Sequence, residues 1–165
     1  MKFPSAIVQS RFDSPLGTMA VAATSVGLAG AWFIGQQHQP PMLDEWPYDD
    51  QHPLLRSARV QLLNYLEGRN TAFDLPLDLC CGTPFQQAVW QQLRTIRRSH
   101  TTSYGALAQA IDRPKAVRAV GAAVGRNPLS VIVPCHRVLG ATGSLTGYAG
   151  GLERKRALLA LEGAL

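Results

Sequence analysis

The most informative stretch of this sequence is Thr102–Asn127, which reads TSYGALAQAIDRPKAVRAVGAAVGRN. Ser103 is a favourable N-cap for a short helix over Tyr104–Ile111, and Pro114 breaks the helical pattern beyond it. A second helix is predicted over Lys115–Val124 and ends in glycine. Two short helices joined by a tight break have helix-turn-helix spacing, so this stretch predicts a DNA-binding motif.

The second predicted helix is poor in bulky side chains. Its three valines, Val117, Val120 and Val124, share one face, which we expect to point toward the core. Arg118 lies off that face, about 100° round from Val117. Alanine and glycine fill most other positions, so the helix can approach another surface closely. Tight packing against another helix and contact with DNA both explain this composition.

Outside this stretch the second half is mainly helical. Thr83–Gln86 forms a capping box with proline at the first helical position. It predicts a helix whose apolar face runs to Ile96 and which ends in the basic tail Arg97–His100. Ser130–Val133 is an apolar run that fits either a buried strand or an extended loop. Glycines predict a loop over Gly140–Gly151, and leucines predict a closing helix over Gly151–Glu162.

The first half is typical of a small antiparallel sheet with one helix. Three short runs separated by turn signals predict its strands: Ala6–Phe12, Gly17–Ala23 and Gly27–Phe33. Prolines predict a surface connection over Gln36–Pro53, an amphipathic pattern predicts a helix over Leu54–Leu66, and Thr71–Leu79 predicts an extended linker. We therefore predict an α+β protein with two lobes, residues 1–78 and residues 79–165.

Composition and charge narrow the classes of function. The chain has 165 residues, of which 46% are hydrophobic, so a packed core is expected. The net charge is +5 although only 16% of residues are charged, which suits a nucleic-acid-binding protein or a merely basic enzyme. No apolar run is long enough to span a membrane, and Met1–Pro4 carries no secretory pattern, so we expect a cytoplasmic protein.

The cysteines and histidines do not form a metal-binding pattern. Cys80 and Cys81 are adjacent, a spacing that suits neither a disulfide nor a zinc knuckle. Three of the histidines are scattered through polar segments: His38, His52 and His100. We expect free thiols in a reducing compartment, and neither a metal nor a cofactor.

Cys135 is the strongest candidate for a reactive residue. A thiol attacks as the thiolate, and its ordinary pKa of about 8.5 leaves it mostly protonated at neutral pH unless a neighbour helps. His136 is a possible base, Arg137 is a nearby positive charge, and Glu162 can orient the histidine. A buried structural cysteine is the alternative, less expected beside proline, histidine and arginine. Because adjacent side chains of a strand point to opposite faces, the cysteine and histidine can cooperate only if the chain turns after Pro134.

The order and spacing of seven motifs resemble a known family. The motifs are Gly82–Gln86, Tyr104–Gly105, Arg118–Gly121, Asn127–Pro128, Pro134–Val138, Thr146–Gly151 and Leu161–Gly163. In this order they resemble the O6-alkylguanine-DNA alkyltransferases, and the resemblance covers about residues 82–163. The preceding part of the chain fits loosely, as the variable N-terminal lobe of that family.

The resemblance implies a direct DNA-repair reaction. An alkyl group of O6-alkylguanine, and of O4-alkylthymine, would move irreversibly to Cys135, once per protein molecule. It also implies a ribonuclease H-like N-terminal lobe, a helical lobe with a winged helix-turn-helix, and a monomer that needs no cofactor. The partner would be double-stranded DNA with alkylated bases, entered from the minor groove. The damaged base would be rotated into a pocket, because its reactive atom cannot be reached inside the stack.

The resemblance further assigns catalytic roles. His136 would activate Cys135 through a water molecule, and Glu162 would polarise the histidine. Asn127 would tie the second helix to the active-site segment. Tyr104 would crowd the phosphate of the target nucleotide and protonate the departing guanine.

Contacts with the DNA and the base follow from the same resemblance. Arg118 would fill the space that the rotated base leaves. The other DNA-contacting residues would be Tyr104, Lys115, Ala119, Ala122 and Arg126. The pocket would be lined by Pro134, Val138, Tyr148 and Ala149, with backbone groups of Cys135 and Val138 reading the edge of the guanine.

Three classes of protein other than an alkyltransferase share some of these features. An alkyltransferase-like lesion sensor shares this domain but has another residue in place of the cysteine, so Cys135 favours the enzyme. A plain helix-turn-helix regulator would need neither Pro134–Arg137 nor Glu162. A cysteine hydrolase would need an oxyanion hole and repeated turnover.

Overall fold

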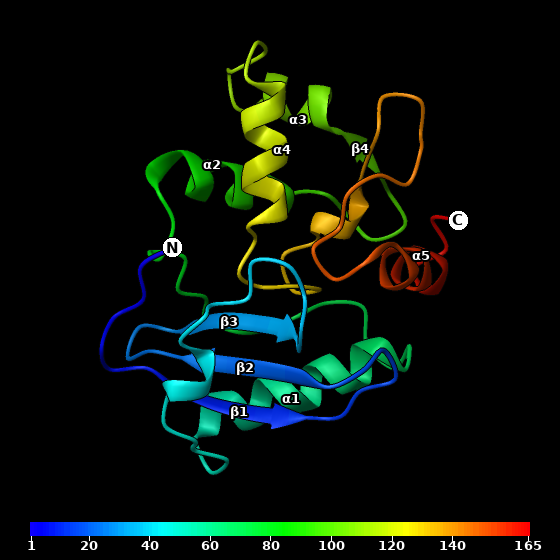
Figure 1. Cartoon of the computed structure of the whole chain (residues 1–165). Helices are drawn as coiled ribbons and strands as arrows, with labels where there is room; N and C mark the ends of the chain where they lie inside the picture. The colour runs from blue at the N-terminus through cyan, green and yellow to red at the C-terminus, as the bar shows by residue number, and fades with distance from the viewer.

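A computed structural model describes all 165 residues of the chain, which form two lobes (Figure 1). The first lobe holds a three-stranded antiparallel sheet of β1 (Val8–Phe12), β2 (Met19–Ala23) and β3 (Leu28–Phe33), with α1 (Pro53–Leu66) beside it. The second lobe holds α2 (Pro84–Leu93), α3 (Tyr104–Ala110), α4 (Val117–Gly125) and α5 (Leu152–Leu161). Short elements complete the order: the 3-10 turns η1 (Leu43–Glu45) and η2 (Cys135–Arg137), and the parallel strands β4 (Thr102–Ser103) and β5 (Val138–Leu139). The predicted α+β class is confirmed.

The sheet of the first lobe is buried on both faces. Because side chains alternate along a strand, Met19, Val21 and Ala23 of β2 enter the main core, while Ala20 and Ala22 face the other way. The small alanine side chains on that second face leave room for aromatic rings that cover the sheet.

Those rings correct the prediction for Gln36–Pro53, which is more than a surface connection. Leu43 and Trp46 of this segment are buried in a small cluster with Trp32 of β3. The rings of Trp32 and Trp46 lie 6.0 Å apart between centroids. The burial of Leu43 and Trp46 could not be predicted from the sequence, because two apolar side chains in a polar, proline-rich loop form no periodic pattern.

In the second lobe, local capping signals place the helix starts. The predicted capping box forms the N-terminus of α2. The Thr83 hydroxyl accepts from the Gln86 amide at 3.3 Å, and the Gln86 side chain accepts from the Thr83 amide at 3.0 Å. The helix ends at Leu93, before the predicted end in the basic tail Arg97–His100. Trp90 is fully buried and its indole donates to the Ala123 carbonyl at 2.9 Å, which joins α2 to α4.

Helices α3 and α4 form the predicted helix-turn-helix. Ser103 caps α3 by accepting from the Ala106 amide at 3.1 Å. Val120 and Val124 of α4 are buried as expected, but Val117 is 38% exposed. Val117 is the first residue of α4, at the end of the helix that points away from the sheet lobe in Figure 1, so the core does not reach it.

One hydrophobic core runs through both lobes, and β3 extends its pairing into the second lobe. The Ala31 amide donates to the Pro128 carbonyl, and the Ser130 amide donates to the Ala31 carbonyl, both at 2.9 Å. Of the two predictions for Ser130–Val133, the strand is wrong, because the segment forms a turn. Val131 has a φ of 74°, a conformation that costs a β-branched residue about 1–3 kcal/mol and is held by the surrounding contacts.

Candidate functional site

Cys135 lies in η2, a single 3-10 turn that follows directly on Pro134. The Cys135 amide donates to the Val133 carbonyl at 2.8 Å, and the Arg137 amide donates to the Pro134 carbonyl at 3.1 Å. The chain therefore turns at Pro134, as Cys135 and His136 require if they are to cooperate.

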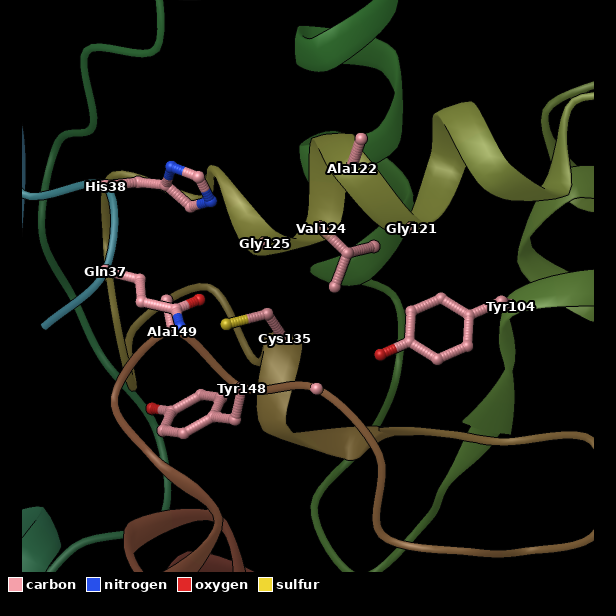
Figure 2. Close-up of a pocket in the computed structure, with 11 residues that line it drawn as sticks. Gln37, His38, Tyr104, Gly121, Ala122, Val124, Gly125, Cys135, Tyr148 and Ala149 are labelled. Carbon is pink, nitrogen blue, oxygen red and sulfur yellow. The ribbon is translucent and has the colours of Figure 1, made fainter.

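The thiol borders a pocket of about 210 Å³ that both lobes enclose (Figure 2). This volume is below the ~300–1,000 Å³ of typical drug-sized sites, so the pocket suits one small group. In Figure 2, Cys135 lies beside α4, between the Gln37–His38 segment on one side and Tyr104 on the other. The lining residues are Gln37, His38, Tyr104, Gly121, Ala122, Val124, Gly125, Cys135, Gly147, Tyr148 and Ala149.

Asn127 ties the end of α4 to the cysteine. Its side-chain amide donates to the Val133 carbonyl at 2.8 Å and to the Cys135 sulfur at 3.1 Å. The same amide is 3.3 Å from the Leu129 carbonyl, while its oxygen accepts from the Leu129 amide at 3.0 Å. Asn127 is buried, so these hydrogen bonds fix both the turn and the direction of the thiol.

Burial raises the pKa of the Cys135 thiol, although the Asn127 hydrogen bond and the charge of Lys155 act in the opposite direction. The resting thiol is therefore protonated at neutral pH. A nearby base must take its proton before the sulfur can attack.

His136 and Glu162 are arranged so that they can supply such a base. The His136 Nε2 atom lies 2.6 Å from the Glu162 Oε1 atom, and both side chains are completely buried. Burial would raise the pKa of the Glu162 carboxyl, but hydrogen bonds from His136 and Arg137 outweigh it and lower the pKa to about 2. Because an ionised carboxylate only accepts hydrogen bonds, Nε2 carries the proton. Nδ1 has no protein partner and is free to accept one. Burial also lowers the pKa of His136, which keeps the ring neutral.

Arg137 has a different role from the predicted one of a positive charge beside the thiol. Its Nε donates to the Glu162 Oε2 at 2.8 Å, and its Nη1 donates to the Ile96 carbonyl at 2.5 Å. Its Nη2 lies 3.1 Å from both the Tyr65 hydroxyl and the Glu162 Oε1. The guanidinium of Arg137 therefore pairs with the Glu162 carboxylate. The cation that acts on the Cys135 thiol is Lys155, whose charge opposes the rise in pKa that burial causes.

Lys155 is fully buried in α5 and holds the loop that closes the pocket. Its ammonium donates to the carbonyls of Val138, Thr146 and Gly147 at 2.5, 2.8 and 3.1 Å. Burial lowers the pKa of Lys155 to about 8. This one side chain fixes the loop that carries Gly147, Tyr148 and Ala149 into the pocket wall.

The predicted DNA-contacting residues lie along one exposed surface of α4 and its ends: Lys115, Arg118, Ala119, Ala122 and Arg126. Ala122 also belongs to the pocket wall, so this surface and the thiol are continuous. Tyr104 stands at the edge, half-buried, and its hydroxyl donates to the Thr146 carbonyl at 3.3 Å. Burial raises the pKa of Tyr104, so the hydroxyl keeps its proton.

The structure does not bring every predicted pocket residue to the thiol. Tyr148 and Ala149 line the pocket, but Pro134 and Val138 do not. Pro134 borders a separate cleft behind the active-site turn. The amide of Val138 donates to the Cys135 carbonyl, and its own carbonyl accepts from Lys155, so both backbone groups already have partners within the protein.

Among the polar side chains of this site, four were not predicted from the sequence: Gln37, His38, Tyr65 and Lys155. For Lys155 a signal existed, because Lys155, Leu158, Leu159 and Glu162 recur at i, i+3, i+4 and i+7, the spacing of one buried helix face. Two charged residues on such a face indicate buried ionic contacts. Gln37 and His38 lie in a polar loop with no comparable pattern.

No group of three or more His, Cys, Asp or Glu side chains is placed to hold a metal ion. Among the helices, none combines the length and the apolar character that crossing a membrane requires.

A helix-turn-helix set over a buried cysteine, with a histidine–glutamate pair behind it, defines a DNA-binding protein that carries a thiol nucleophile. Two family models divide the chain. Residues 84–164 match the model described as 6-O-methylguanine DNA methyltransferase, DNA binding domain. Residues 7–79 match the model of the same methyltransferase described as its ribonuclease-like domain. The chain belongs to the 6-O-methylguanine DNA methyltransferase family, which confirms the resemblance found in the sequence.

Curated relatives and solved structures agree with this assignment. A methylated-DNA–protein-cysteine methyltransferase of Mycobacterium tuberculosis is 48% identical over 151 residues, which cover 91% of this chain and 88% of the relative. A protein of the same name from Haemophilus influenzae is 42% identical over 159 residues, covering 96% of this chain and 87% of the relative. The crystal structure of Mycobacterium tuberculosis OGT in complex with DNA superposes with a TM-score of 0.85 at 44% identity, over 95% of this chain and 93% of that one.

Proposed function

We propose that this protein repairs DNA directly, by moving an alkyl group from the O6 atom of guanine to the sulfur of Cys135. The observation that carries the proposal is the position of the thiol, which borders a pocket of about 210 Å³ that opens under the exposed surface of α4. The relatives named methylated-DNA–protein-cysteine methyltransferase support it, since they match along most of the chain.

The transfer is a single displacement at the alkyl carbon. The sulfur of Cys135 forms a bond to this carbon while the bond from the carbon to O6 breaks, and guanine departs with the bonding electron pair. Tyr104 lines the pocket with its hydroxyl protonated, so it can give a proton to the departing base. The thioether that remains on Cys135 is stable, so each protein molecule acts once.

The proton of the thiol passes to the histidine. His136 offers Nδ1 as the acceptor, and a water molecule between Cys135 and His136 would carry the proton. The imidazolium that forms is stabilised by the buried, ionised Glu162 on its other side. Asn127 donates to the sulfur and stabilises the thiolate during attack.

Access to the base requires that α4 approach the DNA closely. The alanines and glycine of its outer face permit entry into the minor groove, where a helix backbone must lie near sugars and phosphates. Arg118 is exposed on this face and would occupy the space of the rotated base, while Lys115 and Arg126 would contact phosphates. O4-alkylthymine presents the same alkoxy group on a smaller ring and would be a second substrate.

The reaction has consequences for the cellular compartment and the oligomeric state of the protein. A free thiol nucleophile persists where thiols stay reduced, so we place the protein in the cytoplasm. One pocket serves one thiol within a single chain, so a monomer is sufficient for repair.

Mass spectrometry tests the proposal directly. After incubation with duplex DNA that carries O6-methylguanine, the intact mass should rise by one methyl group in place of the thiol hydrogen. Digestion should locate the methyl group on the peptide with Cys135, and Cys135→Ala should abolish the change. Cys81→Ala is the matched control, because Cys81 is buried and burial raises its pKa to about 12.

The same experiment separates the alternatives. Tight binding of alkylated DNA with unmodified Cys135 would refute the transfer and favour the lesion sensor. More than one product molecule per protein molecule would favour a turning-over enzyme instead.

A further inference from the structure

Tyr65 of α1 reaches from the first lobe into the catalytic network of the second. Its side chain is buried, and its hydroxyl donates to the Glu162 Oε1 atom. The same oxygen accepts from His136 Nε2 at 2.6 Å and from Arg137 Nη2 at 3.1 Å. Three donors from two lobes therefore share one carboxylate oxygen, and the reaction described above uses only the one from His136.

The ring of Tyr65 is held in this position by two neighbouring side chains. Phe73 stacks on it with centroids 4.8 Å apart, and the guanidinium of Arg98 lies 5.5 Å from its centroid. Arg98 is itself anchored, because it donates to the Leu161 carbonyl at 2.8 Å, one residue before Glu162. The hydroxyl is thus held on the carboxylate by contacts that do not depend on the hydrogen bond itself.

The hydrogen bonds on Oε1 compete for the same negative charge. A donor that withdraws charge from a carboxylate weakens its attraction for a second donor on the same atom, so Tyr65 and Arg137 both limit how strongly Glu162 attracts the proton of His136. The other groups that face the imidazole are Lys155, whose charge disfavours a second positive charge there, and the ring of Tyr148 at 6.5 Å between centroids.

We propose that Tyr65 is a positioning residue for alkyl transfer, which holds Glu162 in register with His136 and restrains the proton affinity of the histidine. A histidine held neutral has Nδ1 free to accept the thiol proton, whereas a histidine already protonated cannot act as the base. The first lobe thereby sets the pH range in which the second lobe reacts. The proposal rests on the proposed function, because it concerns the same Cys135, His136 and Glu162.

Tyr65→Phe removes the hydroxyl and keeps the buried ring. With one donor fewer on Oε1, Glu162 attracts the His136 proton more strongly, and the pKa of His136 should rise by about one unit, the effect of one hydrogen bond to a charged group. The acid limb of the single-turnover rate should move to higher pH by the same amount. At a pH below both midpoints the variant should react ~10-fold more slowly, while above both midpoints the two rates should agree within about twofold.

The first readout does not depend on activity. Heteronuclear NMR of the imidazole of His136, assigned by comparison with His136→Gln, reports its protonation against pH in the wild type and in Tyr65→Phe. Burial also raises the pKa of Tyr65 to about 12, so the hydroxyl stays protonated throughout the titration. A midpoint in the variant that equals or lies below that of the wild type overturns the proposal, whether or not the protein transfers alkyl groups.

The second readout is the rate of alkyl transfer to Cys135 with free O6-benzylguanine, measured from pH 5 to pH 9. Tyr48→Phe is the matched control, since Tyr48 is an exposed tyrosine of the same lobe outside the network, and its profile should follow the wild type. In a Glu162→Gln background the further change Tyr65→Phe should leave the profile unmoved, because its effect acts through the carboxylate.

The outcomes separate the two proposals. A wild-type protein that takes up no alkyl group refutes the proposed function and leaves the NMR test of Tyr65 intact. A Tyr65→Phe variant that loses rate equally at every pH, with an unshifted His136 titration, shows a purely structural tyrosine and refutes the proposal for Tyr65 alone.

Discussion

Replacing Lys155 by methionine should separate the stability of this protein from its reactivity. Methionine keeps a long unbranched side chain in the core and removes the charge and the donors. Burial lowers the pKa of Lys155 from the usual 10.5 to about 8, a difference of about 2.5 units. At 1.36 kcal/mol for each unit, the buried charge costs the folded state about 3 kcal/mol at pH 7 relative to an exposed lysine.

The loss of hydrogen bonds opposes the gain from removing this charge. Of the three carbonyls that Lys155 binds, those of Thr146 and Gly147 belong to exposed residues and can bind water instead. Only the Val138 carbonyl belongs to a buried residue, and leaving it without a donor costs about 1–3 kcal/mol. The two terms are similar in size and opposite in sign, so the free energy of unfolding at pH 7 should change by less than about 2 kcal/mol.

Reactivity should fall all the same. The variant releases the loop that places Tyr148 and Ala149 in the pocket wall, and it removes the positive charge that lowers the pKa of the Cys135 thiol. A rise of one unit in that pKa alone reduces the thiolate fraction about tenfold. The rate of transfer to Cys135 from O6-methylguanine DNA should therefore drop at least ~10-fold.

The pH dependence gives this prediction a sign. The folded state releases the Lys155 proton near pH 8 and the unfolded state near pH 10.5, so the unfolded state binds more protons in between. The wild type should gain up to about 3 kcal/mol over Lys155→Met as the pH rises through that window. Urea denaturation at several pH values measures the difference, with Arg156→Met, an exposed cation of the same helix, as the control. An unchanged transfer rate, or a stability loss above about 4 kcal/mol at pH 7, would refute the reasoning.

Three further substitutions test other parts of the site. Arg118→Ala should slow repair of duplex DNA more than reaction with free O6-benzylguanine, because only the duplex requires base rotation; equal losses in the two assays would remove Arg118 from that role. Asn127→Ala should lower the unfolding free energy by about 2–3 kcal/mol in chemical denaturation and slow transfer, since it leaves the buried Leu129 amide without its acceptor and deprives the sulfur of its donor. Gly121→Ala should raise the melting temperature through a gain of about 1 kcal/mol in helix propensity, because the added methyl would lie 3.7 Å from the Tyr104 ring, an ordinary contact.

Local signals explain why much of the fold could be predicted from the sequence. Thr83 and Ser103 cap their helices with hydrogen bonds to amides three residues on, so each start can be read from a few neighbouring letters. The turn at Pro134 was predicted as a requirement of the chemistry and is present. Where a signal depends on surroundings, as for the exposed Val117, the periodicity alone misplaced the residue.

The parts that could not be predicted join distant segments. Tyr65 and Glu162 are 97 residues apart, and the contact between Ser130 and Gln36 spans 94. No window of sequence contains both partners of such a pair, and Tyr65 is indistinguishable from any aromatic residue on the apolar face of a helix. Lys155 and Glu162 lie on one face of the same helix, so the sequence could predict that both are buried. It could not predict which distant groups they contact.

These distant contacts give the first lobe a chemical part in the site. The edge of β3 pairs with the segment that precedes the cysteine, and the Ser130 hydroxyl donates to the Gln36 side chain at 3.1 Å. The turn at Val131 is strained, so it persists only while such neighbours hold it. Tyr65 adds a donor to the carboxylate behind the histidine. All motifs that carry chemistry lie in the second half of the chain, but the shape of the turn and the proton affinity of its base depend on the first. The N-terminal lobe therefore contributes to the reactive centre, although its sequence contains no motif that indicates this role.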